Sequence, residues 1–530
     1  MAVIREFLQL DRPLSTLPTY VVLTLVFFLF LFLRYVITPQ RFKGVPEPPL
    51  PSWLWGHSQK VHNTTAGDHY GQWLDKYGPT IRVKAPLWAG KLLVTADPAA
   101  IHHILTTKCY NYTKSTLTRP FVERIIGRGL IWAEGDVHRL QRKQVVPAFS
   151  PEVVNRMEPV VTEVSLKSAA KIGSMVDHGE NIIDMHEMMG KTTLDIFGLV
   201  ALNHDFNCLE GGGAEIRQKV KKQANDFILP SGFFAVAALR AFPPIAHLPI
   251  KSIQEHGSIK KAVTPLALEL IQRGKNDDQV SQNKGNDFMS TMLRNGEMSD
   301  QRLIDNVVTF IVAGYDSTSG SITWGLYSLA RNQRAQDRLR QELLALGHEP
   351  TLKDLTTMEQ LPYFDAVCKE TLRMYPVTDP ERVAHEDDVI PLRFPIVTPE
   401  GEQISAIPIK KGDTIVLPII CSNRLNAVWG DGDVWRPERW LGELPPKDQL
   451  VQGWANLLTF SEGPRNCIGF RLAILELKII IATLIRRFVF TLPSDDFEVQ
   501  GRYFATLLPI VKGQESKGAY MPLKVTPFEE

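Results

Sequence analysis

The chain has 530 residues, of which 44% are hydrophobic and 22% charged, and its formal net charge is +1. This balanced charge argues against nucleic acid as a partner, and the apolar fraction is ample for a large core. The five cysteines are widely spaced and odd in number, and no Cys-x-x-Cys pair occurs. That usage argues against a zinc site or a disulfide framework and suits a reducing compartment.

The N-terminal stretch from Pro13 to Leu33 carries no charge. A membrane-spanning helix needs roughly 20 apolar residues, so this stretch is long enough to cross a bilayer. A cleaved signal peptide is the alternative, but basic residues follow the stretch instead of a small-residue cleavage site. Four prolines between Pro46 and Pro51 then favour a stiff connector. We predict an N-terminal tail (1–12), a transmembrane anchor (13–37) and a proline-rich hinge (38–52).

Two short strands and a helix are predicted next, at 81–84, 91–95 and 98–105, with a turn at Gly90 between the strands. His102 and His103 are neighbours on the predicted helix, so their side chains point apart and do not form a metal pair. From about 151 to 290, helical patterns alternate with polar loops, and this stretch indicates no chemistry.

A basic run from Gly135 to Lys143 contains His138, Arg139 and Arg142. By itself such a run is most simply explained as the solvated face of a helix.

A long apolar helix is predicted from about 300 to 330, with Ser299 as its N-cap. At 1.5 Å per residue it spans about 45 Å, enough to cross a whole domain. Its middle holds two glycines and a run of hydroxylated residues between Ala313 and Ser321, which weaken a helix interior. One explanation is a loop between two helices. We predict instead a local opening of the helical hydrogen bonds that aims polar groups at a buried site.

Glu370 and Arg373 lie three residues apart on a predicted helix from about Tyr363 to Met374, so they share a face. On its own, such a pair is commonly an exposed ion pair that contributes little stability.

A single cysteine, Cys467, stands between Gly463 and Gly469 and just before an apolar helical pattern that begins at Phe470. A lone cysteine is most often a small buried hydrophobic residue. Here the glycines would let a flat group approach, and a helix N-terminus lowers a thiol's pKa. We therefore predict that Cys467 is an anionic sulfur ligand.

Five motifs, spread along the chain from residue 46 to residue 469, resemble motifs of the cytochromes P450. Phe460-x-x-Gly-x-Arg-x-Cys-x-Gly469 resembles the family's haem-binding signature, and Ala313–Thr318 resembles its oxygen-activation motif, with Ser317 at the usual threonine. Glu370-x-x-Arg373 resembles the family's Glu-x-x-Arg pair, whose third member would be Arg439 of the Pro-Glu-Arg segment. The basic run resembles Trp-x-x-x-Arg with His138 at the tryptophan, and the prolines resemble the microsomal hinge.

The resemblance implies the mainly α (α+β) P450 fold: a large helical haem domain (53–530) with a long central helix and small β-sheets, behind one transmembrane helix. It implies haem b, whose iron is bound by the thiolate of Cys467. Phe460 would shield the sulfur, and Asp316 with Ser317 or Thr318 would relay protons. The remaining positions fall into two groups: cofactor-binding Gly463, Arg465, Gly469, Arg142, His138, Arg382 and Ala313, and structural Glu370, Arg373 and Arg439.

The implied activity is insertion of one oxygen atom from O2 into a lipophilic small molecule, such as a terpenoid or fatty acid, in the manner of fungal secondary metabolism. Electrons would come from an NADPH–cytochrome P450 reductase, because the chain has no flavin or nicotinamide fingerprint. The implied location is the endoplasmic reticulum membrane, with a single span and the catalytic domain in the cytosol. The expected pocket residues are Phe121, Phe310, Ala313, Val377 and Thr378.

Two other functions remain as alternatives. A P450-like isomerase or dehydratase would keep the haem without using O2, but the polar run from Asp316 to Thr318 argues against it. A non-catalytic haem-binding sensor would need an output module.

Overall fold

The computed structural model describes residues 41–115, 118–228, 230–243, 245, 258–276, 288–294, 298–357, 359–398 and 400–529. The predicted tail (1–12) and transmembrane anchor (13–37) lie outside the described residues. No helix within the described ranges is both long and apolar enough to span a bilayer.

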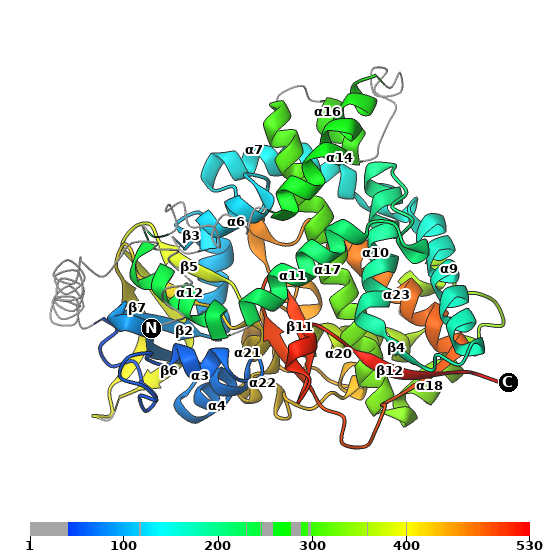
Figure 1. Ribbon diagram of the computed structural model, residues 1–530. Coiled ribbons are helices and arrows are strands. Elements are labelled where there is room, and N and C mark those ends of the chain that lie inside the picture. Colours follow the sequence, from blue (N-terminus) through cyan, green and yellow to red (C-terminus); the bar gives the residue numbers. More distant parts are fainter. Residues whose placement is uncertain are drawn as a thin grey trace, which may run out of the picture.

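Helices form most of the described chain, and Figure 1 shows them packed around one long central helix. The helices are α3 (Ser58–His62), α4 (Asp68–Tyr77), α5 (Pro98–His102), α6 (Thr118–Ile126), α7 (Gly135–Val145), α8 (Pro151–Asn155), α9 (Glu158–Asp177), α10 (Met185–Leu202), α11 (Ala214–Ile228), α12 (Pro230–Ala241), α14 (Ser258–Lys275), α16 (Phe288–Arg294), α17 (Asp300–Arg331), α18 (Gln333–Leu344), α19 (Leu352–Thr356), α20 (Pro362–Met374), α21 (Ile419–Arg424), α22 (Asn426–Trp429) and α23 (Phe470–Arg487).

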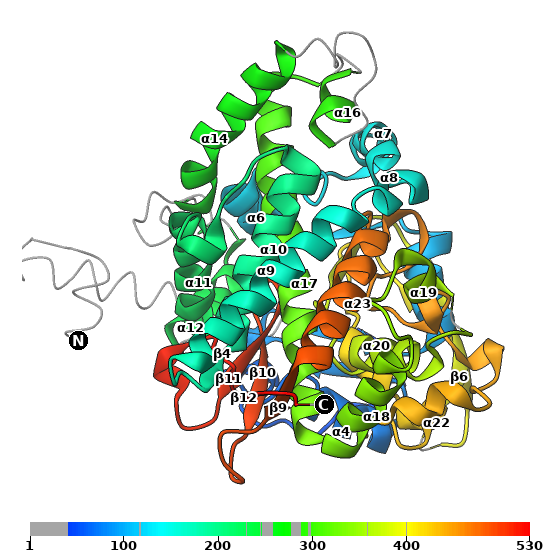
Figure 2. The same ribbon diagram turned by 90° about the vertical axis from the view of Figure 1, so that its right-hand side faces the viewer.

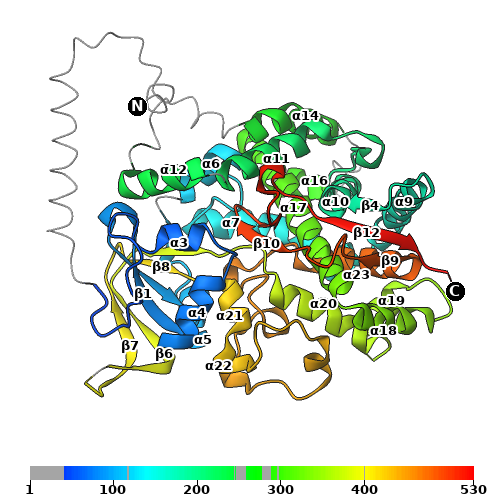
Figure 3. The same cartoon turned by 60° about the horizontal axis from the view of Figure 1, so that its bottom comes forward.

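The strands of the described residues form small sheets. Figure 3 shows the largest sheet and one two-stranded sheet at one side, near α3, α4 and α5, and the three-stranded sheet at the opposite side, near α9. The largest has the order β1 (Thr80–Lys84), β2 (Lys91–Thr95), β8 (Thr414–Val416), β5 (Glu381–Ala384) and β3 (Tyr112–Lys114). The others pair β10 (Val499–Tyr503) with β11 (Leu507–Val511), β6 (Asp388–Val397) with β7 (Gln403–Ile409), and β12 (Pro522–Pro527) with β4 (Ile182–Asp184) and β9 (Phe488–Thr491). The predicted pairing of 81–84 with 91–95 is confirmed.

Residues 41–52, which belong to the predicted hinge, pack against the five-stranded sheet. Phe42 and Val45 are buried, and Glu47 lies 3.0 Å from Arg82 and 3.1 Å from Lys91. This part of the predicted hinge is therefore held on the domain by apolar burial and by charge.

The helix predicted over 98–105 is α5, which ends at His102 and continues as a π-helical turn from His103 to Thr107. As predicted, the two histidines point apart: His102 Nδ1 lies 3.1 Å from Glu462, and His103 Nε2 lies 2.8 Å from Asp388.

The predicted long helix is α17, which extends for 32 residues or about 48 Å. The Ser299 side chain accepts a hydrogen bond from the Arg302 N–H, as an N-cap should. Figure 2 shows α17 between α10 on one side and α23 on the other, and both helices contact it. Nearly every side chain of α17 is buried, which is typical of a helix in the centre of a large core.

The predicted opening in the middle of α17 is wrong, because the helix is continuous through 313–321. The hydroxyl of Ser317 donates to the Ala313 carbonyl, and that of Thr318 donates to the Gly314 carbonyl, so hydroxyls supplement the helical bonds without breaking them. Gly314 has a packing role, since a Cβ there would lie 2.4 Å from the Phe197 ring of α10.

A buried cluster of charges joins α20 to the segment after α22. Arg373 binds Glu370 through two parallel hydrogen bonds of 2.8 Å, and Arg439 Nε donates to Glu370 at 3.0 Å. Burial alone would raise the pKa of Glu370, but the hydrogen bonds and charges of Arg373 and Arg439 hold it below its usual value. Trp440 and the Arg436 N–H also donate to Glu370, so its carboxylate is fully paired.

Loss of the Glu370 charge is therefore expected to destabilise the domain. In Glu370→Gln the buried Arg373 would lose its counter-charge and Arg439 would keep only Asp431, so the free energy of unfolding should fall by about 3–5 kcal/mol. The measurement is the denaturant midpoint. Glu498→Gln, which breaks the exposed pair with Lys512, is the control and should leave the midpoint unchanged. Equal midpoints for the two variants would contradict this account of the cluster.

Candidate haem-thiolate site

The predicted ligand Cys467 lies in a loop between Phe460 and the start of α23. Its N–H donates to the Phe460 carbonyl at 2.8 Å, which closes the loop, and Gly469 is the N-cap residue of the helix. The Phe460 ring is half-buried and contacts Phe470. The thiol is exposed even though it lies deep within the protein. A deep side chain with accessible surface borders an interior space, so the thiol is available to an internal ligand.

The helix N-terminus acts on the pKa of Cys467 in the predicted direction, but it does not decide the net shift in the chain alone. Burial raises the pKa of this thiol, and the opposing effects of the Gly469 N–H and the Arg142 charge do not outweigh it. Bound metal ions deprotonate a coordinating thiol outright. The donors that would stabilise the resulting anion are already present.

The two glycines of the loop differ in what they accommodate. Gly463 has φ = +71°, and a Cβ there would lie 2.4 Å from the Leu105 carbonyl, so the close packing on the π-helical turn requires glycine. Gly469 has no such neighbour, since a Cβ there would meet only Phe149, at 3.7 Å. The protein alone therefore explains Gly463 but not Gly469, which leaves Gly469 free to border a ligand.

Asn423 connects the loop to the charged cluster below it. Its side chain accepts from the Leu458 N–H at 2.9 Å and donates to Thr459 at 3.0 Å, and its carbonyl accepts from Arg373. The cluster of Glu370, Arg373 and Arg439 thus fixes the loop that carries Cys467.

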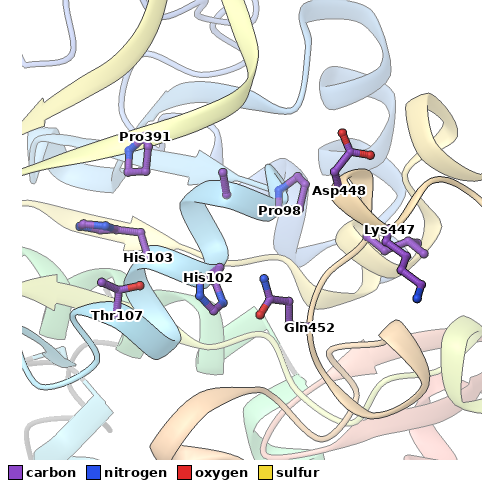
Figure 4. A pocket seen from close by; sticks show the side chains of 10 residues that line it. Pro98, His102, His103, Thr107, Pro391, Lys447, Asp448 and Gln452 are labelled. Carbon is purple, nitrogen blue, oxygen red and sulfur yellow. The ribbon is translucent and has the colours of Figure 1, made fainter.

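Glu462 anchors the loop from another side. Its buried carboxylate accepts from His102, from Thr106 and from the Gln452 N–H, at 2.8–3.2 Å. His102 and Gln452 also line a surface pocket of about 270 Å³, in which His102 and His103 point to different sides (Figure 4). This pocket contains neither Cys467 nor any residue of α17, so it is separate from the thiol site.

The side chains predicted to bind haem propionates form a buried group rich in positive charge. Arg465 pairs with Glu134 and donates to the Ala133 carbonyl, and Lys114 lies 3.1 Å from the same Glu134. Burial and neighbouring cations lower the pKa of Lys114 to about 8 and that of Arg382 to about 10. Arg382 donates to the carbonyl of its neighbour Glu381, and no carboxylate of the described residues accepts from it. This group can therefore take up anionic oxygens.

Arg142 and His138, which lie one turn apart on α7, take different places in this group. Arg142 donates to the carbonyl and side chain of Asn466, next to Cys467. His138 is buried and hydrogen-bonded to the Tyr110 hydroxyl at 3.2 Å. Burial and the charges of Arg465 and Arg142 lower the pKa of His138 to about 3, so its imidazole is neutral at physiological pH. His138 and Arg142 of the basic run therefore face inward, whereas Arg139 and Lys143 lie on an exposed face of the helix.

A short accessible stripe interrupts the buried surface of α17. Every side chain is buried from Leu303 to Ile311 and from Thr318 to Ala330, whereas those at 312, 313, 316 and 317 are half-buried. These four positions share one face of the helix. Ala313, Asp316 and Ser317 therefore border an interior space, while the Thr318 hydroxyl does not.

The residues expected to line the substrate pocket come from several parts of the structure. The half-buried Phe121 of α6 contacts Phe227 of α11 and Phe504 of the β10–β11 turn. Val377 is half-buried and Thr378 is exposed. Phe310, which was predicted to line the pocket, instead packs in the core against Phe149 and Phe288. The physical reason is its place in the fully buried part of α17.

Sequence reasoning missed several residues of the site. Glu134, which binds both Lys114 and Arg465, immediately precedes the basic run and could have been found there. Thr506, which donates to Asp316, has no local signal because it lies 190 positions further along the chain.

Comparisons with known proteins agree with this geometry. The family model for cytochrome P450 matches residues 46–512. Cytochrome P450 monooxygenase claP of Ampulloclitocybe clavipes is 32% identical over 98% of this chain and 100% of its own length. Cytochrome P450 monooxygenase 205 of Postia placenta is 31% identical over 93% of this chain and 94% of its own length. The chain therefore belongs to the cytochrome P450 family and is an oxidoreductase of the monooxygenase type.

Proposed function

We propose that this chain is a haem-thiolate monooxygenase that inserts one oxygen atom from O2 into a lipophilic small molecule. The observation that carries the proposal is that two groups deep within the protein keep accessible surface. One is the thiol of Cys467, and the other is the stripe of α17 that contains Asp316 and Ser317. An isomerase or dehydratase that does not use O2 would have no need for an acid and a hydroxyl on such a stripe.

Several observations fit a bound haem b. Cys467 would supply the axial sulfur, and Phe460 would shield it. Arg382, Arg465 and Arg142, with His138 as a neutral hydrogen-bonding group, would meet the propionates, and this group carries more positive charge than Glu134 balances. Gly463, Gly469 and Ala313 would border the ring. When bound, a haem with a thiolate ligand supplies the chemistry of O–O cleavage and oxygen transfer.

The protein's own contribution is to hold protons and to orient the substrate. Burial raises the pKa of Asp316, although the hydrogen bond from Thr506 and the charge of His186 oppose that rise. A carboxyl group with a raised pKa can hold a proton in the interior and release it. Ser317 is the neighbouring hydroxyl that shares the accessible stripe, so we assign the relay to Asp316 and Ser317 rather than to Thr318.

We propose a lipophilic substrate, because Phe121, Phe227 and Phe504 form an aromatic cluster that would offer it an apolar surface. A terpenoid-like secondary metabolite or a fatty acid fits that surface. Metabolite profiling of a fungal host that expresses the chain would identify the product.

Electrons would come from an NADPH–cytochrome P450 reductase, since the sequence carries no fingerprint for a flavin or a nicotinamide. We propose that both proteins lie at the endoplasmic reticulum membrane, with this chain anchored through residues 13–37 and its domain in the cytosol.

The carbon monoxide difference spectrum of the reduced protein tests the haem ligand. The full chain should give the red-shifted band of a thiolate-bound haem, and Cys467→Ala should abolish that band. Cys109→Ala is the matched control. Cys109 is a buried cysteine that experiences the charges of Arg382 and Arg465, but it lies outside the loop that carries Cys467. Retention of the band in Cys467→Ala, or its loss in both variants, would contradict the proposal.

Substitutions on α17 test the relay. Asp316→Asn and Ser317→Ala should keep the carbon monoxide spectrum and lower the yield of the profiled product, by roughly 100-fold for Asp316→Asn. Thr318→Val removes a buried hydroxyl one residue away and should keep the yield. If Thr318→Val loses as much product as Ser317→Ala, the choice of Ser317 is wrong.

Deletion of the first 37 residues tests the anchor. The full chain should remain in membranes washed with alkaline carbonate, whereas the shortened chain should move largely to the supernatant. Equal retention of both forms would rule out an anchor at 13–37.

A further inference from the structure

The buried acid of α17 has a partner that lies far from it in the sequence. Thr506 Oγ1 donates a hydrogen bond of 2.8 Å to Asp316 Oδ2. Thr506 is 9% exposed and lies in the turn between β10 and β11, which contacts α17 through β11. The contact is therefore a part-buried hydrogen bond at the edge of the interior space that Asp316 borders.

The other polar groups around Asp316 do not replace this contact. The Ser317 hydroxyl donates to the Ala313 carbonyl, and the Thr318 hydroxyl donates to the Gly314 carbonyl. His186 of α10 acts on Asp316 through its charge, and no hydrogen bond joins the two in the described residues. Thr506 thus supplies the hydrogen bond that fixes the direction of the carboxyl group.

The turn that carries Thr506 is held in place without its hydroxyl. The Phe504 N–H donates to the Thr506 carbonyl at 3.1 Å, and the Trp324 indole donates to the Leu507 carbonyl at 3.0 Å. The Tyr503 hydroxyl donates to the Pro376 carbonyl, and the Phe504 ring packs on Phe227. Loss of the Thr506 hydroxyl should therefore affect Asp316 more than it affects the fold.

We propose that Thr506 is a positioning residue for the proton relay, and that it holds Asp316 by donating to Oδ2. Because Oδ2 accepts this bond, Oδ1 is the oxygen left to carry and release the proton. The inference rests on the proposed monooxygenase function, since it assigns Thr506 to that relay. The turn also carries Phe504 of the pocket wall, so the acid and the wall share one short segment.

The test is a pH titration of Asp316 in the haem-loaded full chain, in which infrared spectroscopy monitors the carboxyl band. The band is assigned by its loss in Asp316→Asn. A hydrogen bond to the charged form favours ionisation, so Thr506→Val should raise the pKa of Asp316 by about one to two pH units. Thr506→Ser keeps the donor and should restore the titration of the parent chain. Thr506→Ala gives the same prediction as Thr506→Val, and it does so without placing a methyl group where the hydroxyl was.

Thr318→Val is the matched control, because it removes a buried hydroxyl of the same helix that donates to the Gly314 carbonyl and not to Asp316. It should leave the pKa of Asp316 unchanged. Product yield should fall in Thr506→Val and recover in Thr506→Ser. An unshifted Asp316 titration in both Thr506→Val and Thr506→Ala would overturn the inference, and so would an equal shift in Thr318→Val. Failure of the monooxygenase function itself would appear separately, as a missing thiolate band or a missing oxygenated product.

Discussion

The paired hydrogen bonds between Glu370 and Arg373 are the contact on which the thiol site depends. Both side chains are fully buried, so each charge is tolerable only because the other is present. Arg373 also donates to the carbonyls of Asn423 and Gly432, and Asn423 binds the segment that leads into the cysteine loop. The charged pair thus fixes backbone that carries no regular hydrogen bonds of its own.

The site combines this rigid support with an unbalanced charge. Arg142, Arg382 and Arg465 lie near the loop with Lys114, and Glu134 is the carboxylate that pairs within the group. Buried cations are costly without counter-charges, as the lowered pKa of Arg382 indicates. A bound group with two carboxylates would relieve that cost. The proposed proton relay on α17 differs from this cationic group. The pKa of Asp316 is raised by burial, and its hydrogen-bond donor, Thr506, is neutral.

Much of the fold and site followed from the sequence because the signals were local. Residues three apart on a helix share a face, so the Glu370–Arg373 pair was predictable, and the turn at Gly90 indicated the two strands that form β1 and β2. The opening predicted in α17 failed because a hydroxyl can bond within a helix as well as outside it. The pKa of Cys467 is raised overall, because burial outweighs the lowering effects of the Gly469 N–H and the Arg142 charge.

The sequence by itself determined the family and the long helix and predicted the sulfur ligand, since each depends on residue types at fixed short spacings. The tertiary structure decided which side chains meet: Thr506 with Asp316, Arg142 with Asn466, and Phe310 with the core instead of the pocket. It also decided that Ser317, and not Thr318, borders the interior space. These outcomes depend on how helices and turns pack across hundreds of residues, and no short spacing in the chain encodes them.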